Sequence, residues 1–388
     1  MRGFSLIFLP TLKCNAACEY CFEEKSSATM SLDDFRIILA KIMDYMNVTE
    51  IPELRIYWQG GEILTMEPDW FMRALDVIRS LAHRNNKRVF NELQTNLIGY
   101  GKRWNRVIRE MFSNEVGSSL DFPNLYRKTP GGSPADYNDL WLRRYREARA
   151  HGIHIGVISL PNEESFRIGA QPFYSYYTNK VGLNGFQLNT PFPGGPSQSS
   201  EIQFALNCED YIRFSLDLID IWIEDGYDSG IGISPFDGLL DYFKTGDSGG
   251  LLCGMRGDCS RDFFCIDPEG NVSQCDCWVT SYPRFRFGNI FRDRDLQAIM
   301  NSPQRRMFGE RPVKLIENSD CIECAYLSAC HGGCAIRAYS AHGDLDTKDP
   351  YCEAYKALFR HLEHWAVKLA ADKRWRKRPR ERTLEQSS

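Results

Sequence analysis

The chain has 388 residues, of which 43% are hydrophobic and 25% are charged, and its net charge is −4. This composition is typical of a globular protein of one or two domains; it predicts neither a nucleic-acid partner nor a membrane partner, since no apolar run reaches the length of a membrane span. No small-residue cleavage site follows the short apolar run near the N-terminus, so we expect a cytoplasmic location, where fourteen cysteines favour metal binding over disulfides.

From residue 1 to about 205 the sequence alternates strand-like and helix-like segments. Strands are expected at Phe4–Leu9, Leu54–Trp58, Val89–Gln94, Val116–Leu120, Ile153–Leu160 and Gly185–Asn189. Helices are expected from Ser31 to about Tyr45, over Pro68–His83, and at about 136–150 and 172–181. Repeated β-α units predict an α/β fold with a parallel sheet, in which ligands bind at the carboxyl ends of the strands.

The pattern changes in the second half of the chain. A helix around Asn207–Glu224 leads into a region where glycine, cysteine and turn residues increase and helix periodicity fades between about 246 and 353. Within it, Phe263–Ile266 and Asn271–Gln274 flank a turn sequence and predict a hairpin.

After Cys352 an amphipathic helix is expected to about Ala371, followed by the basic tail Lys373–Arg382, which we interpret as a solvated end rather than a partner-binding arm. These changes divide the chain into a first domain (1–205), a helical linker (206–245), a cysteine-rich domain (246–352) and a C-terminal helix with its tail (353–388).

Three cysteines directly follow the first expected strand. Cys14, Cys18 and Cys21 have the spacing C-x3-C-x2-C. Three thiolates on one loop suit an iron–sulfur cluster, and three protein ligands leave one iron open to a small molecule. The alternative is a zinc site, which would need a fourth ligand.

This motif, with the aromatic Tyr20 before its third cysteine, resembles that of the radical S-adenosylmethionine (radical SAM) superfamily. The resemblance implies a partial (β/α)6 TIM-like barrel and SAM bound to the open iron, with Tyr20 in the cofactor site. Gly60, Gly61 and Glu62 end the second expected strand and match the Gly-Gly-Glu motif of this family, which implies that they hold the SAM amino group. The family usually continues with proline, whereas Ile63 follows here.

Further SAM contacts are implied at the next strand ends. Gln94 ends the third strand, as a similar tripeptide does in this family, and Ser119 ends the next and is expected to contact the sugar or carboxylate of SAM. Arg144, in the following helix, is placed like an arginine that pairs with the SAM carboxylate; the alternative is a solvated helix face.

The second group of cysteines resembles the SPASM extension of radical SAM enzymes, a cysteine-rich domain that holds two auxiliary [4Fe–4S] clusters. The resemblance implies one cluster on Cys253, Cys259, Cys275 and Cys334, and another on Cys321, Cys324, Cys330 and Cys352. With the first motif this predicts three [4Fe–4S] clusters in all. Cys208, Cys265 and Cys277 are left as inert thiols, and Cys265 is the rival of Cys253 as a ligand.

Within the superfamily, the sequence resembles anaerobic sulfatase-maturating enzymes. The similar segments are Phe236–Leu240, Cys253–Met255, Cys275-Asp276 and Phe287–Ile290. The resemblance implies that Asp276 is the base that accepts a proton when the substrate is oxidised. Alternatively, Asp276 only orders the cluster loop by hydrogen bonds.

The predicted function is oxidative modification of a peptide or protein. Phe122-Pro123 stands where the maturases have glycine, and 127–137 and 189–196 do not match them. Because strand-end loops read the substrate, we rank crosslinking of a ribosomally synthesised peptide above formylglycine formation. A small-molecule dehydrogenase or epimerase is the next alternative, and a non-catalytic metal protein the last. A flavodoxin or ferredoxin is the expected electron donor, and no leader-binding domain is expected before Cys14.

Overall fold

The computed structural model describes residues 4–199 and 206–371. Its strands are β1 (Phe4–Phe8), β2 (Glu53–Trp58), β3 (Arg88–Leu93), β4 (Glu115–Ser119), β5 (His154–Ser159), β6 (Gly185–Leu188), β7 (Gly232–Ser234), β8 (Phe263–Ile266), β9 (Asn271–Ser273) and β10 (Gly288–Asn289). Its helices are α1 (Leu32–Val48), α2 (Pro68–Asn85), α3 (Asn105–Phe112), α4 (Pro134–Ala150), α5 (Glu163–Ile168), α6 (Ala170–Ser175), α7 (Cys208–Ile221), α8 (Phe236–Thr245), α9 (Asp276–Val279), α10 (Leu296–Met300), α11 (Pro303–Glu317), α12 (Leu327–Cys330), α13 (Ala335–His342) and α14 (Cys352–Ala371).

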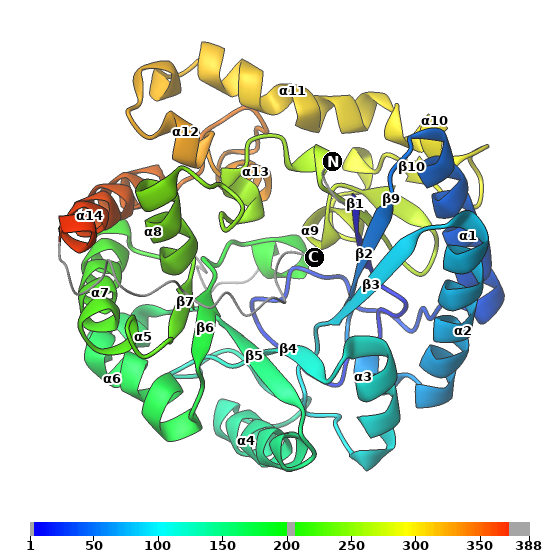
Figure 1. Cartoon of the computed structure of the whole chain (residues 1–388), viewed down its shortest axis with the longest axis horizontal. Coiled ribbons are helices and arrows are strands. Elements are labelled where there is room, and N and C mark those ends of the chain that lie inside the picture. The colour runs from blue at the N-terminus through cyan, green and yellow to red at the C-terminus, as the bar shows by residue number, and fades with distance from the viewer. Residues whose placement is uncertain (1–3, 200–205, 372–388) are drawn as a thin grey trace.

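The strands β1 to β7 form a partial barrel. β1, β2 and β3 pair in parallel, as do β4, β5, β6 and β7, and a parallel bridge between Gln94 and Gly117 links the two groups. The strands curve around the centre of the molecule with α1, α2, α3 and α4 outside them (Figure 1). The predicted fold class, a TIM-like partial barrel followed by a cysteine-rich region, is confirmed.

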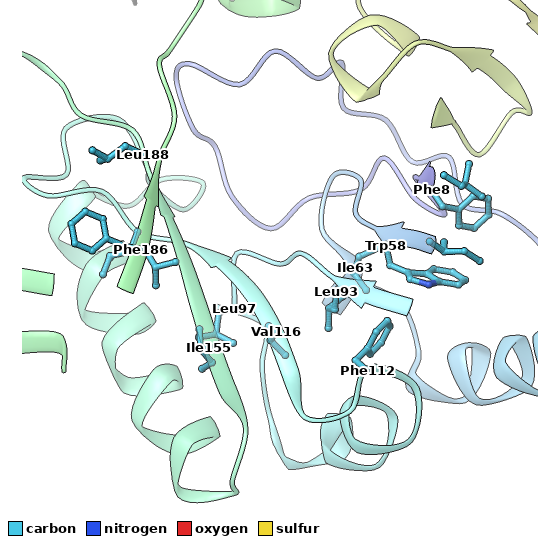
Figure 2. Packing of buried hydrophobic residues seen from close by; sticks show 14 of the residues in the cluster. Phe8, Trp58, Ile63, Leu93, Leu97, Phe112, Val116, Ile155, Phe186 and Leu188 are labelled. Atoms are coloured by element: carbon cyan, nitrogen blue, oxygen red, sulfur yellow. The ribbon is translucent and has the colours of Figure 1, made fainter. Parts of the chain in front are cut away.

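Alternating burial explains why the predicted strands form. In β2, Leu54, Ile56 and Trp58 are fully buried while the residues between them are partly exposed, the period of two that a strand requires. Trp58 packs edge-on against Phe8 with ring centroids 5.1 Å apart, within the apolar core shown in Figure 2. The six strands expected up to residue 189 are confirmed, each within about two residues at its ends.

Local capping fixes the helices of the barrel. The Ser31 side chain accepts a hydrogen bond from the Asp34 amide at the start of α1, and Ser133 and Asp136 form a reciprocal capping box at the start of α4. These caps begin each helix directly after a strand-end loop, so the loops stay at one end of the barrel.

The cysteine-rich half is attached to the barrel sheet. β8 pairs in parallel with β1, from Ser5 opposite Phe263 to Phe8 opposite Ile266, and β9 and β10 extend the sheet beyond it. The Lys41 ammonium of α1 donates to the carbonyls of Ile290 and Asp293. The carboxyl ends of β1 and β8 therefore meet at the same sheet edge.

The expectation that helix periodicity fades between 246 and 353 is wrong for two segments, α11 and α13. Pro312 lies inside α11 and weakens its sequence signal, although the helix buries Phe308 and Leu315. The predicted hairpin is confirmed as β8 and β9, and the predicted C-terminal helix as α14. The tail 373–382 lies outside the described residues.

None of the helices in 4–199 and 206–371 is both long enough and apolar enough to be a candidate membrane span.

Candidate functional site: a cysteine loop at the barrel mouth and two further thiol groups

The first three cysteines lie on the loop between β1 and α1. The loop is closed by backbone hydrogen bonds from the Leu12 amide to the Ala28 carbonyl and from the Met30 amide to the Pro10 carbonyl. Its far side is held by the Ala17 amide, which donates to the Lys128 carbonyl at 2.7 Å. The chain itself therefore fixes the loop at the carboxyl end of β1.

A single cation lies beside all three thiols. Burial lowers the pKa of Lys25, but the neighbouring thiols of Cys21, Cys14 and Cys18 raise it above its usual value. Burial raises the pKa of Cys14 to about 12, and Lys25 opposes this rise. Thiols whose protons are costly to remove in an apolar site suit metal, because metal binding makes thiolate formation favourable.

Gly60 and Gly61 pack against the cysteine loop. A Cβ atom on Gly60 would lie 2.3 Å from the Thr11 carbonyl oxygen, and one on Gly61 would lie 2.4 Å from that of Lys13. The Gly61 amide donates to the Thr11 carbonyl at 3.0 Å. Glycine is therefore required here so that the end of β2 can approach the backbone of the loop.

The Glu62 carboxylate connects β2 to the segment after β3. It is 2% exposed and accepts hydrogen bonds from the amides of Leu64 and Asn96, at 2.9 and 2.7 Å, and from the Thr95 hydroxyl. Burial raises its pKa, although these three bonds oppose the rise. The predicted SAM-binding carboxylate is thus held rigidly at the barrel mouth.

Gln94 and Ser119 also meet at this edge, as predicted from their positions at strand ends. The Gln94 amide nitrogen donates to the Ser119 hydroxyl at 3.2 Å. The Tyr137 hydroxyl of α4 lies 3.4 Å from the carbonyls of Asn96 and Ser119.

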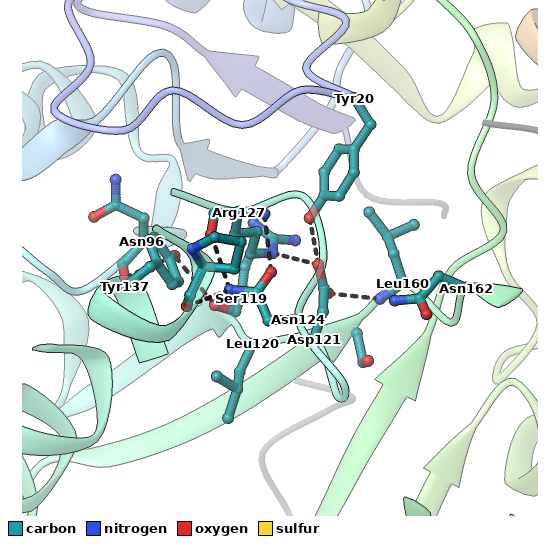
Figure 3. A network of polar contacts seen from close by, with 12 residues as sticks. Tyr20, Asn96, Ser119, Leu120, Asp121, Asn124, Arg127, Tyr137, Leu160 and Asn162 are labelled. Carbon is teal, nitrogen blue, oxygen red and sulfur yellow. Dashed lines mark hydrogen bonds and ion pairs between the residues drawn. The ribbon is translucent and has the colours of Figure 1, made fainter. Parts of the chain in front are cut away.

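Tyr20 belongs to a buried polar network that the sequence analysis did not identify (Figure 3). Its hydroxyl donates to Asp121 at 2.5 Å, and the Arg127 guanidinium donates to the same carboxylate oxygen at 2.8 Å. Asp121 also accepts from the Leu160 amide at 2.9 Å, and its side chain is 2% exposed. Burial lowers the pKa of Arg127, but Asp121 outweighs this and holds it well above its usual value.

Arg144 does not belong to this polar network. Its guanidinium pairs with Glu147 one turn along α4 at 2.9 Å, and both side chains are about one-third exposed. Its buried Nε has no hydrogen-bond partner among the described residues. Arg127, by contrast, is buried beside the cysteine loop, with its guanidinium carbon 5.2 Å from the centroid of the Tyr20 ring.

The four cysteines predicted to hold one auxiliary cluster come together in the structure. Burial raises the pKa of Cys259, and the neighbouring thiols of Cys253, Cys334 and Cys275 raise it further. A Cβ atom on Gly254 would lie 3.1 Å from the Cys334 Cβ, so the loop after Cys253 packs directly against Cys334. The backbone thus brings together residues that are far apart in sequence.

The second predicted set lines a single cavity beside α12 and the start of α14. Its walls include all four cysteines of that set, Cys321, Cys324, Cys330 and Cys352. Lys348 and Lys356 also line it, and both ammonium groups lie close enough to lower the pKa of Cys352, which burial raises. Four convergent thiols in one cavity are suitable ligands for an iron–sulfur cluster.

The remaining cysteines differ in their surroundings. Cys265 is fully buried in β8 and packs with Leu9, Leu12 and Val279, as an inert thiol would. Cys277 does not fit that interpretation as well, because its sulfur, the Cys275 sulfur and an Asp276 oxygen lie within 4.8 Å of one another. Cys277 is therefore a rival ligand that the sequence analysis did not identify. Cys208 begins α7 and lies beside Ala354 at the start of α14, and burial raises its pKa.

Asp276 lies between the first cysteine loop and the first auxiliary set. It directly follows Cys275, and Gln59, at the end of β2, hydrogen-bonds to its carboxylate. Burial raises the pKa of Asp276 despite that bond. Burial also raises the pKa of Glu23, just after the cysteine loop, to about 8, with Asp276 as the next cause. The two carboxyl groups thus face one region of the barrel mouth.

Two hydrogen bonds hold these segments together. The Glu24 amide donates to the Thr280 hydroxyl at 3.4 Å, and the Ser281 hydroxyl donates to the Phe22 carbonyl. Phe22 also stacks on Phe192, whose loop follows β6, with ring centroids 5.6 Å apart. The barrel mouth is therefore enclosed by the first cysteine loop, the segment after Asp276 and the loop around Phe192.

One family model matches part of the chain, and several curated proteins match nearly all of it. The model of the SPASM family, an iron–sulfur cluster-binding domain, matches residues 258–325. The cysteine-type anaerobic sulfatase-maturating enzyme of Clostridium perfringens is 26% identical over 377 residues, which cover 93% of this chain and 96% of that protein. The serine-type enzyme of Bacteroides thetaiotaomicron is 24% identical over 378 residues, covering 90% and 86%.

Two solved structures share the fold. Native anSMEcpe with bound AdoMet superimposes with a TM-score of 0.78 at 24% identity, covering 95% of this chain and 99% of that one. Streptococcus suis SuiB bound to precursor peptide SuiA superimposes with a TM-score of 0.59 at 15% identity, covering 91% and 76%.

Proposed function

We propose that this chain, a radical SAM protein with a C-terminal SPASM domain, oxidatively modifies a residue within a peptide or protein substrate. The observation that carries the proposal is the position of Asp276, a partly buried carboxylate between the first cysteine loop and a set of four convergent thiols. Such an oxidation needs three parts: a group that removes hydrogen, a base and an electron acceptor. The mouth of the barrel can hold all three.

The cofactors that these residues fit are SAM and iron–sulfur clusters, and we propose three clusters. When bound, SAM and the cluster on Cys14, Cys18 and Cys21 supply a 5′-deoxyadenosyl radical that abstracts a hydrogen atom from the substrate. Gly60, Gly61 and Glu62 would hold SAM from the end of β2, together with Tyr20, Gln94 and Ser119. For the SAM carboxylate, which we expected Arg144 to bind, Arg127 is the better placed cation.

The chain's own residues complete the oxidation. Asp276 would accept the proton that leaves when the substrate carbon is oxidised, and its raised pKa suits that role. Gln59 would orient the Asp276 carboxylate through their hydrogen bond. The stacked rings of Phe22 and Phe192 would exclude water from the mouth, because they close it beside Cys21.

Two outcomes of such an oxidation remain candidates. Crosslinking of a ribosomally synthesised peptide is supported by strand-end loops that differ from the maturase pattern, including Phe122-Pro123. Formylglycine formation is supported by the similarity to the sulfatase-maturating enzymes over nearly the whole chain. We propose the crosslinking reaction first and a flavodoxin or ferredoxin as the donor, with a cytoplasmic location.

The test uses the anaerobically reconstituted protein with SAM, a one-electron reductant and two kinds of peptide. One kind is encoded beside the gene, and the other spans the cysteine or serine site of a sulfatase from the same organism. A crosslinked product, which gains no aldehyde, supports the first outcome; an aldehyde that reacts with a hydrazide supports the second. SAM cleavage without modification of either peptide would contradict a peptide or protein substrate.

A further inference from the structure

One arginine of the cysteine-rich half is buried without an ion-pair partner. Arg311, in α11, is 3% exposed. Its guanidinium donates only to backbone carbonyls, those of Leu345 at 2.7 Å, Thr347 at 3.0 Å, Gly333 at 3.2 Å and Gly332 at 3.3 Å. No carboxylate lies within ion-pair distance of it in the part of the chain that the structure describes.

The nearest carboxylate of comparable burial is already neutralised. Asp349 is 2% exposed and pairs with the Arg337 guanidinium at 2.7 Å. It also accepts a hydrogen bond from the Cys334 amide at 2.9 Å. The positive charge of Arg311 is therefore left over in a buried region, and an unpaired buried charge costs several kcal/mol unless something compensates it.

Two thiols of the first auxiliary set, those of Cys334 and Cys259, lie near this charge. Arg337 is a second cation beside the same set, near Cys253 and Cys334, but it is paired with Asp349. Burial lowers the pKa of Arg311, and the thiols of Cys334 and Cys259 oppose that effect more strongly than Asp349 and Asp346 do. Two of the carbonyls that Arg311 binds, those of Gly332 and Gly333, directly precede Cys334. The guanidinium thus both holds the backbone beside Cys334 and places its charge against the sulfurs.

A [4Fe–4S] cluster on four thiolates is anionic, and it becomes more so when reduced. A buried cation stabilises the more negative state in a low-dielectric region, and charge near a cluster is one of the features that set its reduction potential. By contrast, the second auxiliary set has Lys348 and Lys356 as its cations, both on the edge of a cavity. Their exposure leaves these charges screened by solvent.

We infer that Arg311 is the buried counter-charge without a carboxylate partner beside the auxiliary cluster on Cys253, Cys259, Cys275 and Cys334, and that it raises the reduction potential of that cluster. Arg311 is a positioning residue, because it acts through the cluster rather than on the substrate. This inference rests on the proposed function, in which this cluster would accept the electron that leaves the substrate and Asp276 would accept the proton.

The experiment is an EPR-monitored redox titration of the cluster-loaded full-length chain, compared with Arg311→Gln, Arg311→Lys and Arg306→Gln. Arg306 is the matched control, since it lies on the same helix but is exposed. In Arg311→Gln we expect one auxiliary cluster to be about tenfold harder to reduce, a fall of about 59 mV for one electron. Arg311→Lys and Arg306→Gln should stay close to the unchanged chain.

Each outcome decides the inference. An Arg311→Gln protein with all clusters and unchanged potentials overturns it. If Arg311→Gln loses one cluster while Arg311→Lys keeps it near the original potential, the charge is required and the inference stands. If both lose the cluster, Arg311 only holds the carbonyls, and the inference fails. The potentials need no substrate, so they remain informative even if no peptide is modified.

Discussion

The two cysteine regions of this chain use the same side chain in different structural settings. Cys14, Cys18 and Cys21 lie within one short loop that backbone hydrogen bonds already close. The auxiliary sets gather thiols from distant segments, such as Cys253 with Cys334 and Cys321 with Cys352. Metal in the first region would join residues that are already neighbours, whereas metal in the second would link segments that the chain must first bring together.

The size of this difference follows from the entropy of loop closure. On the chain-entropy model of a crosslink, a loop of under ten residues gives about 2–3 kcal/mol of stabilisation and one of roughly 80–100 residues gives about 4–5 kcal/mol. The cluster on Cys253 and Cys334 would close a loop of this longer kind, whereas that on Cys321 and Cys352 would close one of roughly 30 residues, for which the same model gives about 3–4 kcal/mol. Metal would therefore serve mainly chemistry in the first region and both chemistry and folding in the second.

The cysteine-rich half also has an apolar core of its own. Trp278 packs against Phe285 at 4.8 Å and against Phe308 at 5.1 Å, and Phe285 packs against Tyr339 at 5.0 Å. The auxiliary clusters would therefore add to a partly formed core rather than replace it. Loss of metal should loosen the segments that carry the thiols before it loosens this aromatic cluster.

The largest effect should come from removing the first thiol group. Changing Cys14, Cys18 and Cys21 to Ala should abolish SAM cleavage and lower iron from about 12 to about 8 per chain, since each cubane holds four irons. The fold should persist, because the loop is closed by its own backbone. Iron analysis, a 5′-deoxyadenosine assay and circular dichroism measure the three quantities.

Two single variants are the controls for that experiment. Cys265→Ala should keep all the iron, because this thiol is buried among apolar side chains in β8, whereas Cys253→Ala should damage one cluster. If Cys265→Ala loses iron and Cys253→Ala does not, Cys265 is the ligand and Cys253 is the inert thiol. SAM cleavage surviving in the triple variant would remove the first loop from the cofactor site.

The next largest effect concerns the link between the two regions, Asp276. Asp276→Asn should still cleave SAM and transfer deuterium from labelled substrate to 5′-deoxyadenosine, while product forms about 10²- to 10⁴-fold more slowly, the usual contribution of a positioned base. Mass spectrometry measures both in one assay. Normal product yield from a fully loaded variant would limit Asp276 to ordering the cluster loop.

A smaller effect is expected in stability, where variants of two arginines of the barrel half should differ. Arg127→Met leaves the buried Asp121 carboxylate without its cation, so we expect a loss of about 3–5 kcal/mol in the free energy of unfolding. Arg144→Met breaks a partly exposed pair with Glu147 and should cost at most about 1 kcal/mol.

Denaturant titration of the two variants, loaded in the same way, gives both values. SAM affinity measured on the same samples shows which guanidinium the cofactor needs, and we expect the weaker binding in Arg127→Met. Equal stability and equal SAM affinity in the two variants would contradict the roles assigned to both arginines.

Local patterns predicted much of the fold and many of the site residues. Alternation in Leu54–Trp58 and the cap at Ser31 are signals within a few residues, and the structure has β2 and α1 there. The segment of α11 was missed because Pro312 interrupts its pattern. The four thiols around Cys259 were grouped by family resemblance, and their sequence separation alone would not have joined them.

Residues whose importance depends on tertiary neighbours could not be predicted. Arg127 is one cation in a loop of unremarkable composition until the fold buries it beside Asp121. Arg144 lies in an arginine-rich helix, α4, which directs it to Glu147. Arg311 likewise shows its environment only when α11 packs against the carbonyls of Gly333 and Leu345. Cys277, by contrast, lies two residues from Cys275, so its role as a rival ligand had a local signal.

Hydrogen exchange of the full-length chain tests the central claim most directly. It compares the cluster-loaded protein, the same protein after anaerobic removal of iron, and the loaded Cys14/Cys18/Cys21→Ala variant. We predict that iron removal strongly increases exchange in 318–352 and around Cys253 and Cys259, while β2 and β3 remain protected, and that the triple variant matches the loaded protein outside its own loop. Equal loss of protection in both halves after iron removal, or loss in 318–352 in the triple variant, would contradict the account.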